Sequence, residues 1–202
     1  MFTRQEISAL YAYILTQSLP PEQALAQINQ QLAQIDKQKS SPTYAIERSS
    51  LIYQRGLLYV NKLGQPEKAI ADFRTYLTHH PDSAQGQNAL GYNLLEMGKE
   101  HLPEALALIS AAYKKEPNNP QIADSMGWAY YQNAEYPKAQ TILAQAYEQD
   151  KDAEIGAHLG AALWQLGKHR QAKKIWQASW QKEASNPSLQ KILKEFNISF
   201  EK

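Results

Sequence analysis

A short motif recurs three times in the middle of this chain. A large apolar residue precedes a glycine in Asn88-Ala-Leu-Gly-Tyr92, Asp124-Ser-Met-Gly-Trp128 and Ala157-His-Leu-Gly-Ala161. The three glycines, Gly91, Gly127 and Gly160, are separated by 36 and 33 residues. A period of roughly 20 to 50 residues is the signature of a solenoid or of an array of stacked units. The chain is therefore expected to be a repeat protein, in which each unit packs on its neighbours.

A second set of positions completes each repeat. An alanine stands twelve residues after Gly127 and after Gly160, and a bulky residue follows four residues later. The pairs are Ala69 and Phe73, Ala105 and Ile109, Ala139 and Leu143, and Ala172 and Trp176. After Gly91 the alanine comes two residues late, which indicates an insertion at 99–102. Small residues let two helices approach closely, and the bulky residue fills the space between them.

Prolines mark the helix starts, because proline is tolerated in the first turn of a helix and breaks it elsewhere. Between these stops the apolar residues recur at helical spacing, and no segment alternates with period two. We therefore expect an all-α fold without β-sheet. The predicted helical hairpins are 3–38, 45–81, 84–117, 120–150 and 153–184, followed by a last helix at 188–196.

Three parts are predicted from these hairpins. Residues 1–40 form a degenerate helical hairpin, because the helix around Tyr11 lacks the glycine. Residues 45–187 form an array of about four repeats, the first of which has Leu57 where glycine belongs and Gly56 one residue early. Residues 188–202 form a capping helix and tail. The segment 39–42 is the expected linker between the first two parts.

Composition and missing motifs argue against several kinds of function. The 202 residues carry 21 Lys+Arg against 20 Asp+Glu, whereas nucleic-acid and polyanion binders carry a large excess of positive charge. There is no cysteine, so disulfides, thiol nucleophiles and Cys-ligated metals are excluded. Zincin, hydrolase-elbow and phosphate-loop motifs are absent. We expect no catalytic site, no metal, no cofactor, no nucleic-acid partner and no direct membrane insertion.

Histidines and one basic cluster have structural explanations. His79 and His80 end a helix and are expected to interact with its C-terminus, with metal binding as the alternative. His158 lies inside a helix beside Leu159 and is expected to be buried and hydrogen-bonded. The basic segment 168–174 is expected to be a solvated helix face, although basic residues beside aromatics can also bind nucleic acid or anionic lipid.

Counting from each glycine predicts the side chains on the concave face of the solenoid. Positions three residues before, one residue after, and four or five residues after the glycine fall on that face. We predict a partner-binding groove formed by Asn88, Tyr92, Leu95, Asp124, Trp128, Tyr131, Trp164 and Gln165. Tryptophan and tyrosine dominate binding hot spots, so a peptide with apolar anchors would suit this surface.

Two alternatives to this groove stay open at this stage. Trp128 and Trp164 could instead fill the core between repeats, because repeat packing buries many aromatic residues. A clamp for a peptide carboxylate is disfavoured, because amides and Asp124 stand where cations are needed, although Arg55 and Lys62 lie near the second hairpin.

The motifs resemble those of tetratricopeptide repeat (TPR) proteins. TPR units are two antiparallel helices of about 34 residues, so the resemblance implies a right-handed superhelix of about five hairpins with a C-terminal capping helix. From about Ile46 to Leu193, the chain is similar to the C-terminal TPR array of Gram-negative outer-membrane TPR lipoproteins, some of which are adaptors for a periplasmic C-terminal processing protease. Three blocks carry this resemblance: 88–92 with its long turn, 124–130, and 153–164.

The resemblance implies a non-catalytic adaptor or scaffold that binds a protein or peptide in bacterial envelope protein assembly or proteolysis. The members of that group carry a signal peptide and a lipidated cysteine, which this sequence lacks. We therefore expect the periplasmic side of the outer membrane if the chain is a fragment, and the cytoplasm if it is complete. The alternative is a cytoplasmic regulatory module that forms homodimers through its terminal helices, including the stripe with Phe196.

Overall fold

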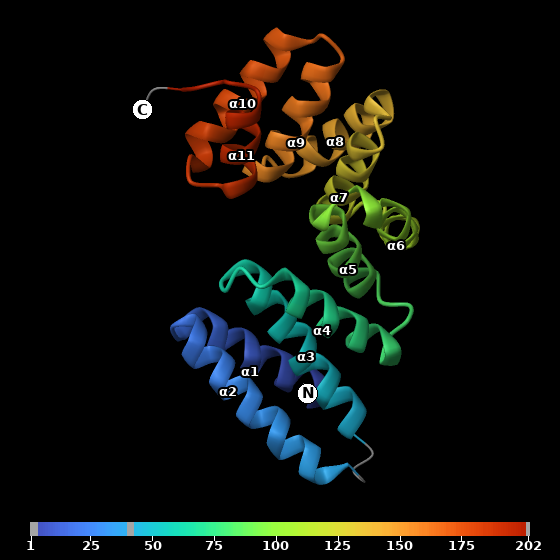
Figure 1. The fold of residues 1–202 in the computed structure, drawn as a ribbon, viewed down its shortest axis with the longest axis vertical. Coiled ribbons are helices and arrows are strands. Elements are labelled where there is room, and N and C mark those ends of the chain that lie inside the picture. Colours follow the sequence, from blue (N-terminus) through green and yellow to red (C-terminus); the bar gives the residue numbers. More distant parts are fainter. Residues whose placement is uncertain (1–3, 40–42, 201–202) are drawn as a thin grey trace. The chain divides into compact units, whose positions relative to one another are not determined.

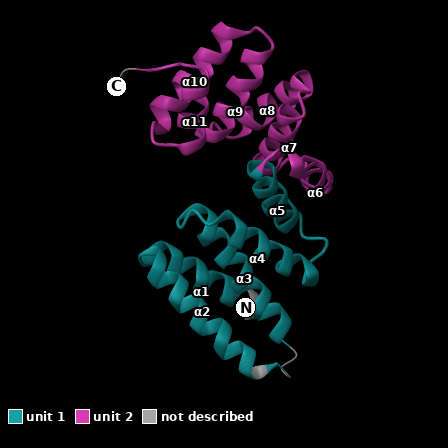
Figure 2. Ribbon diagram, in the orientation of Figure 1, with its two compact units in different colours: residues 1–97 teal, residues 98–202 magenta. Residues whose placement is uncertain are grey.

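The computed structural model of the chain describes residues 4–39 and 43–200. These residues form α-helices and two short 3-10 helices, and none of them forms a strand, so the expected all-α fold is confirmed (Figure 1). The expected linker at 39–42 falls largely outside the described residues. The chain divides into two compact units, residues 1–97 and 98–202, which are described separately (Figure 2).

Unit 1 contains two helical hairpins and one further helix. Its helices are α1 (Arg4–Ser18), α2 (Pro21–Ile35), the 3-10 helix η1 (Asp36–Gln38), α3 (Tyr44–Asn61), α4 (Pro66–His79) and α5 (Ala84–Met97). The side chains of Ala24 and Ile28 from α2 and of Leu51 and Ile52 from α3 form a buried apolar core beside α1. Arg55 of α3 ties the hairpins together, since its guanidinium donates to both carboxylate oxygens of Asp72 and to Asn29.

Unit 2 begins with the residues that the repeat spacing identified as an insertion. They form the 3-10 helix η2 (Lys99–His101), which leads into α6 (Leu102–Lys115). Then follow α7 (Pro120–Gln132), α8 (Tyr136–Gln149), α9 (Ala153–Gln165), α10 (His169–Glu183) and α11 (Pro187–Glu195). Side-chain caps fix three of these starts: Asn119 accepts from backbone N–H groups of α7, Asp152 of α9 and Asn186 of α11.

The repeat glycines and the bulky residues predicted to pack against them are in contact between paired helices. A Cβ added at Gly127 would lie 2.5 Å from Cγ of Leu143, and one added at Gly160 would lie 2.5 Å from Cδ1 of Trp176. Both partners are fully buried. The glycines are therefore needed for the close approach of α7 to α8 and of α9 to α10.

The register of the second hairpin differs by one residue from the expected one. Gly56, and not Leu57, takes the place of the repeat glycine, since a Cβ added there would lie 2.7 Å from Cε1 of Phe73. Gly56 precedes the end of α3 by five residues, as Gly127 precedes the end of α7. The turn after α3 has four residues, 62–65, whereas the turn after α7 has three, 133–135. The extra residue therefore lies in the turn, where sequence spacing alone could not place it.

The C-terminal helix caps unit 2. Leu189, Ile192 and Leu193 of α11 are buried, while Lys191 and Lys194 are exposed. α11 packs against α9 and α10. The apolar stripe of this helix is thus used within the chain. Among the described helices, none is long and apolar enough to cross a bilayer.

Candidate functional site

The eight residues predicted for the groove fall in both units. Asn88, Tyr92 and Leu95 lie on α5 of unit 1. The other five lie on α7 and α9 of unit 2, which are the first helices of successive hairpins: Asp124, Trp128, Tyr131, Trp164 and Gln165. The structure therefore brings the predicted residues together in two groups, each on its own unit.

Asp124 is buried and is not an accessible groove residue, so the prediction is wrong at this position. Nδ1 of His158 lies 2.9 and 3.0 Å from the two carboxylate oxygens of Asp124. The exposed fractions are 5% for Asp124 and 1% for His158. Burial raises the pKa of the Asp124 carboxyl, and the neighbouring His158 opposes that rise. A buried carboxyl needs such a partner, so this pair joins α7 to α9 across the repeat interface.

Trp128 is also interior, which favours the core alternative for this residue. Its ring stacks on His158 at a centroid distance of 4.1 Å and on Tyr131 at 4.5 Å. The exposed fraction of Trp128 is 5%. Its expected exposure in a groove is therefore corrected: the ring fills the space between α7 and α9, because a flat aromatic face gains more by stacking than by facing water.

Trp164 is half-buried, so part of its ring belongs to the core between repeats and part is accessible to a partner. Its ring contacts Trp176 at 5.6 Å, Phe196 at 5.7 Å and His169 at 4.2 Å, measured between centroids. These contacts join α9, α10 and the residue that follows α11.

Tyr131 and Gln165 are the accessible part of the unit 2 group. Gln165 is exposed, and its side-chain nitrogen donates to the Tyr131 hydroxyl at 3.4 Å. Tyr131 is half-buried, and burial raises the pKa of its hydroxyl, while the bond from Gln165 lowers it. Behind the Tyr131 ring lie Trp128 and then His158, in a continuous stack. The two polar groups are thus presented on a rigid apolar support.

The predicted residues of unit 1 also differ in how far they are buried. Leu95 is predicted to line an open groove, but it is only 5% exposed and lies beside the buried Leu94. The prediction is corrected for this residue, because an apolar side chain is more stable in the interior. Tyr92 and Asn88 are half-buried. The Asn88 side-chain oxygen is buried without a hydrogen-bond partner. A buried acceptor without a hydrogen-bond partner is costly to the fold.

A small cavity lies between α1 and α3, and sequence counting missed the part that α1 contributes. It has a volume of about 90 Å³ and an apolar base that includes Leu57 and Leu58. Carboxamides of Gln17, Gln54 and Asn61 line it together with Lys62. The contribution of α1 could not be found, because the first hairpin lacks the repeat glycine. Arg55 is engaged by Asp72 and cannot serve a carboxylate clamp.

A metal site would need several His, Asp or Glu side chains close together. Within 4–39 and 43–200, no three His, Asp or Glu side chains are placed to share a metal ion. Nε2 of His80 is hydrogen-bonded to Ser49 at 2.7 Å, and its ring stacks on Tyr76. Its role is therefore in packing α4 against α3.

Known proteins show which fold and repeat this is. Residues 50–83 match the family model described as "Tetratricopeptide repeat". The TPR repeat-containing protein PA4667 of Pseudomonas aeruginosa is 40% identical over 116 residues, which are 56% of this chain and 19% of the relative. The chain thus spans about a fifth of the length of that curated relative.

Two solved structures extend the comparison to nearly the whole chain. TTC0263, a thermophilic TPR protein of Thermus thermophilus, has a TM-score of 0.69 at 17% identity, covering 96% of this chain and 100% of that one. YrrB, a TPR protein with an unusual peptide-binding site, has a TM-score of 0.59 at 18% identity, covering 93% of this chain and 90% of that one. Residues 50–83 are therefore a tetratricopeptide repeat, and the fold around them is the fold of tetratricopeptide-repeat proteins.

Proposed function

We propose that this chain is a non-catalytic adaptor that binds a protein or peptide partner through the first helices of its repeats. The carrying observation is the Tyr131–Gln165 pair, which faces outward from two neighbouring first helices while a buried stack holds it from behind. Preorganised aromatic and amide groups lower the entropy cost of binding. Tyrosine adds large contact area and one hydrogen-bonding group.

Each unit carries its own proposed binding surface, formed by the accessible members of the predicted set. In unit 2 these are Tyr131, Gln165 and the exposed part of Trp164; in unit 1 they are Tyr92 and Asn88. Carboxamides and a tyrosine hydroxyl suit the N–H and C=O groups of an extended peptide backbone, and the ring faces suit its apolar side chains. The solved structure of YrrB, of similar fold, is described as having a peptide-binding site, which supports the proposal.

The proposed place of action is the bacterial cell envelope, in protein assembly or proteolysis. Support comes from the similarity of the three motif blocks to outer-membrane TPR lipoproteins and from the TPR relative in Pseudomonas aeruginosa. The alternative is a cytoplasmic module that self-associates through its terminal helices. Self-association through α11 is disfavoured, because this helix buries its apolar stripe on its own unit.

A pull-down with matched variants tests the surface. The double variant Tyr131→Ala with Gln165→Ala removes the pair, while Tyr113→Ala with Gln177→Ala removes the same residue types from the second helices α6 and α10. Envelope and cytosolic extracts of a Gram-negative bacterium are applied separately, and the retained proteins are identified and their affinities measured.

We expect wild type and the control variant to retain the same envelope protein. The Tyr131→Ala and Gln165→Ala variant should bind it about 30-fold more weakly, the loss of one hot spot of about 2 kcal/mol. Equal affinity in all three proteins would refute the proposed surface. A partner found only in the cytosolic extract would refute the envelope location and leave the surface standing.

A further inference from the structure

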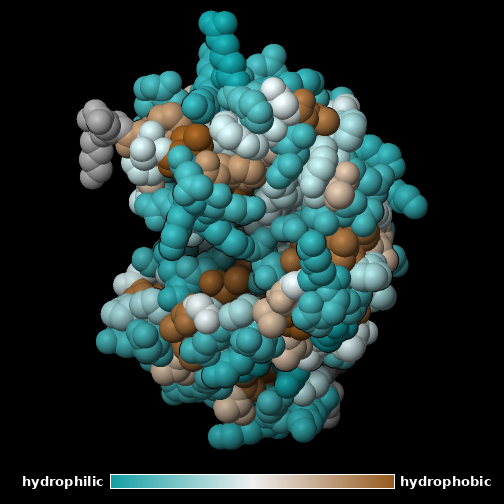
Figure 3. Space-filling view, turned by 45° about the horizontal axis from the view of Figure 1, so that its top comes forward, coloured by the Kyte–Doolittle hydropathy of each residue, from teal (hydrophilic) through white to brown (hydrophobic). Residues whose placement is uncertain are grey.

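Helix α1 exposes its large apolar residues and buries small ones. Ile7, Leu10, Tyr13 and Ile14 are each about half exposed, between 48% and 54%, and Tyr11 is 39% exposed. The opposite side of the helix, with Ser8 and Ala12, faces the unit, and Ala12 is fully buried. A surface helix normally has the reverse arrangement. The face of the molecule drawn in Figure 3 is mostly hydrophilic, with apolar residues in small groups.

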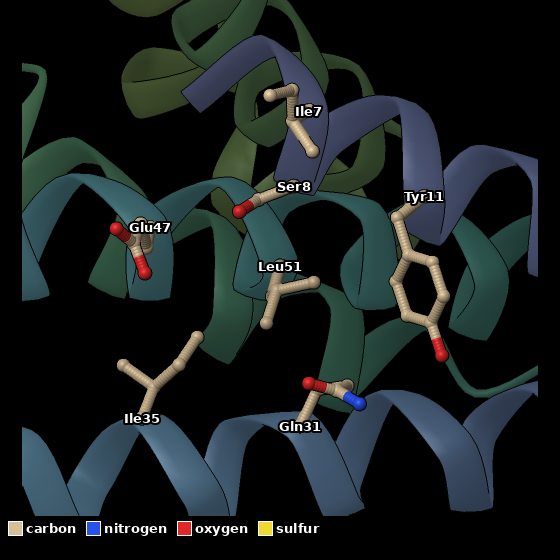
Figure 4. A pocket seen from close by; sticks show the side chains of 7 residues that line it. All are labelled: Ile7, Ser8, Tyr11, Gln31, Ile35, Glu47 and Leu51. Atoms are coloured by element: carbon tan, nitrogen blue, oxygen red, sulfur yellow. The ribbon is translucent and has the colours of Figure 1, made fainter. Parts of the chain in front are cut away.

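A cleft adjoins the exposed residues of α1. It has a volume of about 300 Å³ and lies between α1, α2 and α3 (Figure 4). Ile7 and Tyr11 of α1 line one side, Ile35 of α2 lies opposite, and Leu51 of α3 lies between them. Ser8, Gln31 and Glu47 also line the cleft, so the apolar surface of α1 adjoins a hollow of mixed polarity. Such a hollow can accept side chains of another helix, as helix-in-groove complexes do.

The chemistry of α1 suits a copy of itself. From Ile7 to Ser18 the sequence contains no charged residue, so two α1 helices can pack together without like-charge repulsion. A strongly acidic or basic partner would find no complementary charge on this stripe. The same absence of charge removes the usual protection of a monomer against self-association.

Helices α1 and α11 differ in the side chains that they expose, and this difference favours a symmetric contact. Stacking of the N-terminal hairpin of one copy on the C-terminal helix of the next would need an apolar surface on α11. That helix buries Leu189 and Ile192 and exposes Lys191 and Lys194. Contact between the α1 helices of two copies pairs apolar with apolar side chains, and such an isologous contact closes at two copies.

The available area is enough for a weak dimer. With roughly 200 Å² for a large side chain, the exposed parts of the five residues amount to about 500 Å² in each copy. Two copies would then bury at most about 1,000 Å², the lower limit for a specific interface. Interfaces at this lower limit are typical of weak, reversible association.

We propose that the chain forms a two-fold symmetric homodimer through α1. The two α1 helices pack antiparallel, with the axis near Leu10 and Tyr11, the middle of the exposed stripe. Ile7 of one copy then lies close to Ile14 of the other, and apolar side chains of each α1 reach the cleft of the other copy. The residues of this interface lie on α1 of unit 1, and none of them belongs to the residues proposed above for partner binding.

Sedimentation equilibrium between about 1 and 500 µM tests the dimer. Wild type should change from monomer to dimer across this range, and Leu10→Asp should weaken the association at least about 100-fold, because it places a charge at the axis in both copies. Ala71→Asp, which adds the same charge to an exposed position on α4, should associate like wild type. A wild-type monomer at every concentration, or equal association of wild type and Leu10→Asp, would overturn the proposal.

Single cysteines test the geometry, since the chain has none of its own. On mild oxidation Leu10→Cys should form a disulfide-linked dimer, and a mixture of Ile7→Cys and Ile14→Cys should form the mixed disulfide in preference to either homodimer. Ala178→Cys, exposed on α10, should stay monomeric. Equal crosslinking at residues 10 and 178 would overturn the interface. The Tyr131→Ala and Gln165→Ala variant should dimerise normally, so the failure of either proposal can be recognised separately.

Discussion

The replacement Gly160→Ala should destabilise unit 2 even though alanine is the better helix former. Alanine in a helix interior gains about 1 kcal/mol over glycine. The new Cβ, however, would lie 2.5 Å from Cδ1 of Trp176 and closer still to its indole nitrogen. Trp176 has no exposed surface and is flanked by Trp164 and Phe196, so its ring cannot move away without disturbing both.

Two costs oppose the gain in helix propensity. Overpacking of a filled core costs about 1–3 kcal/mol. A displaced Trp176 would also lose the 3.0 Å bond from its indole N–H to the carbonyl of Ala157, and a buried unpaired donor costs about 1–3 kcal/mol. The net loss in the free energy of unfolding should therefore be about 3 kcal/mol.

Urea unfolding followed by circular dichroism measures this loss, and a double-mutant cycle identifies its cause. Trp176→Ala removes the ring that the new methyl group would strike, so Gly160→Ala in that background should be stabilising by up to about 1 kcal/mol. Trimethylamine oxide keeps the cavity-bearing variants folded. If Gly160→Ala stabilises the wild-type chain, or destabilises both backgrounds equally, then the close approach of α9 to α10 is not what requires glycine.

Two further predictions concern buried titratable groups. His158→Ala should lower the free energy of unfolding at pH 7 by about 3–5 kcal/mol, because it leaves the Asp124 carboxylate buried without a partner. Adding Asp124→Ala to this variant should restore part of the lost stability. If urea unfolding shows no restoration, the pairing of these two residues is contradicted. Burial raises the pKa of Tyr53 to about 12. Since the folded state holds this proton more tightly than the unfolded chain, about 3 kcal/mol of stability should be present below pH 10 and lost as the pH rises from 10 to 12. Tyr53→Phe should remove that alkaline loss, and stability equally pH-dependent in both proteins would contradict it.

The helices could be predicted from the sequence because their signals are local. The prolines at the helix starts, the glycines at the close approaches and the alanines opposite them each act within one hairpin. Gly160 and Trp176 are sixteen residues apart, and their contact follows directly from the repeat. The one-residue error at Gly56 arose in a turn, where length is not constrained by packing.

Exposure on the first helices could not be predicted in the same way. Counting from the glycine gives the direction of a side chain but not how closely the next helix covers it. Asp124 and His158 lie 34 residues apart, and only the stacking of α7 on α9 brings them together. One signal was present: an acid and a histidine occupy adjacent places in successive repeat motifs, 124–128 and 157–161. Such a pair across repeats indicates a buried link.

The exposed stripe of α1 needed the structure for a related reason. Both faces of this helix contain apolar residues, since Ala12 lies on one and Leu10 on the other, so periodicity does not say which is buried. The smaller residues face α2 and α3, because only small side chains let α1 approach them closely. The large residues are left outside and remain available for another molecule.

The residues stacked behind Tyr131 stabilise unit 2, whereas Tyr131 itself is accessible to a partner. Asp124, His158 and Trp128 use their polar and aromatic surfaces on one another, so substitutions there should change the stability of unit 2 more than the choice of partner. Tyr131 and Gln165 have accessible surface, and substitutions there should change the partner with little effect on stability. A repeat array can therefore keep its fold while its specificity varies, because the residues that contact a partner are not the residues that hold the repeats together.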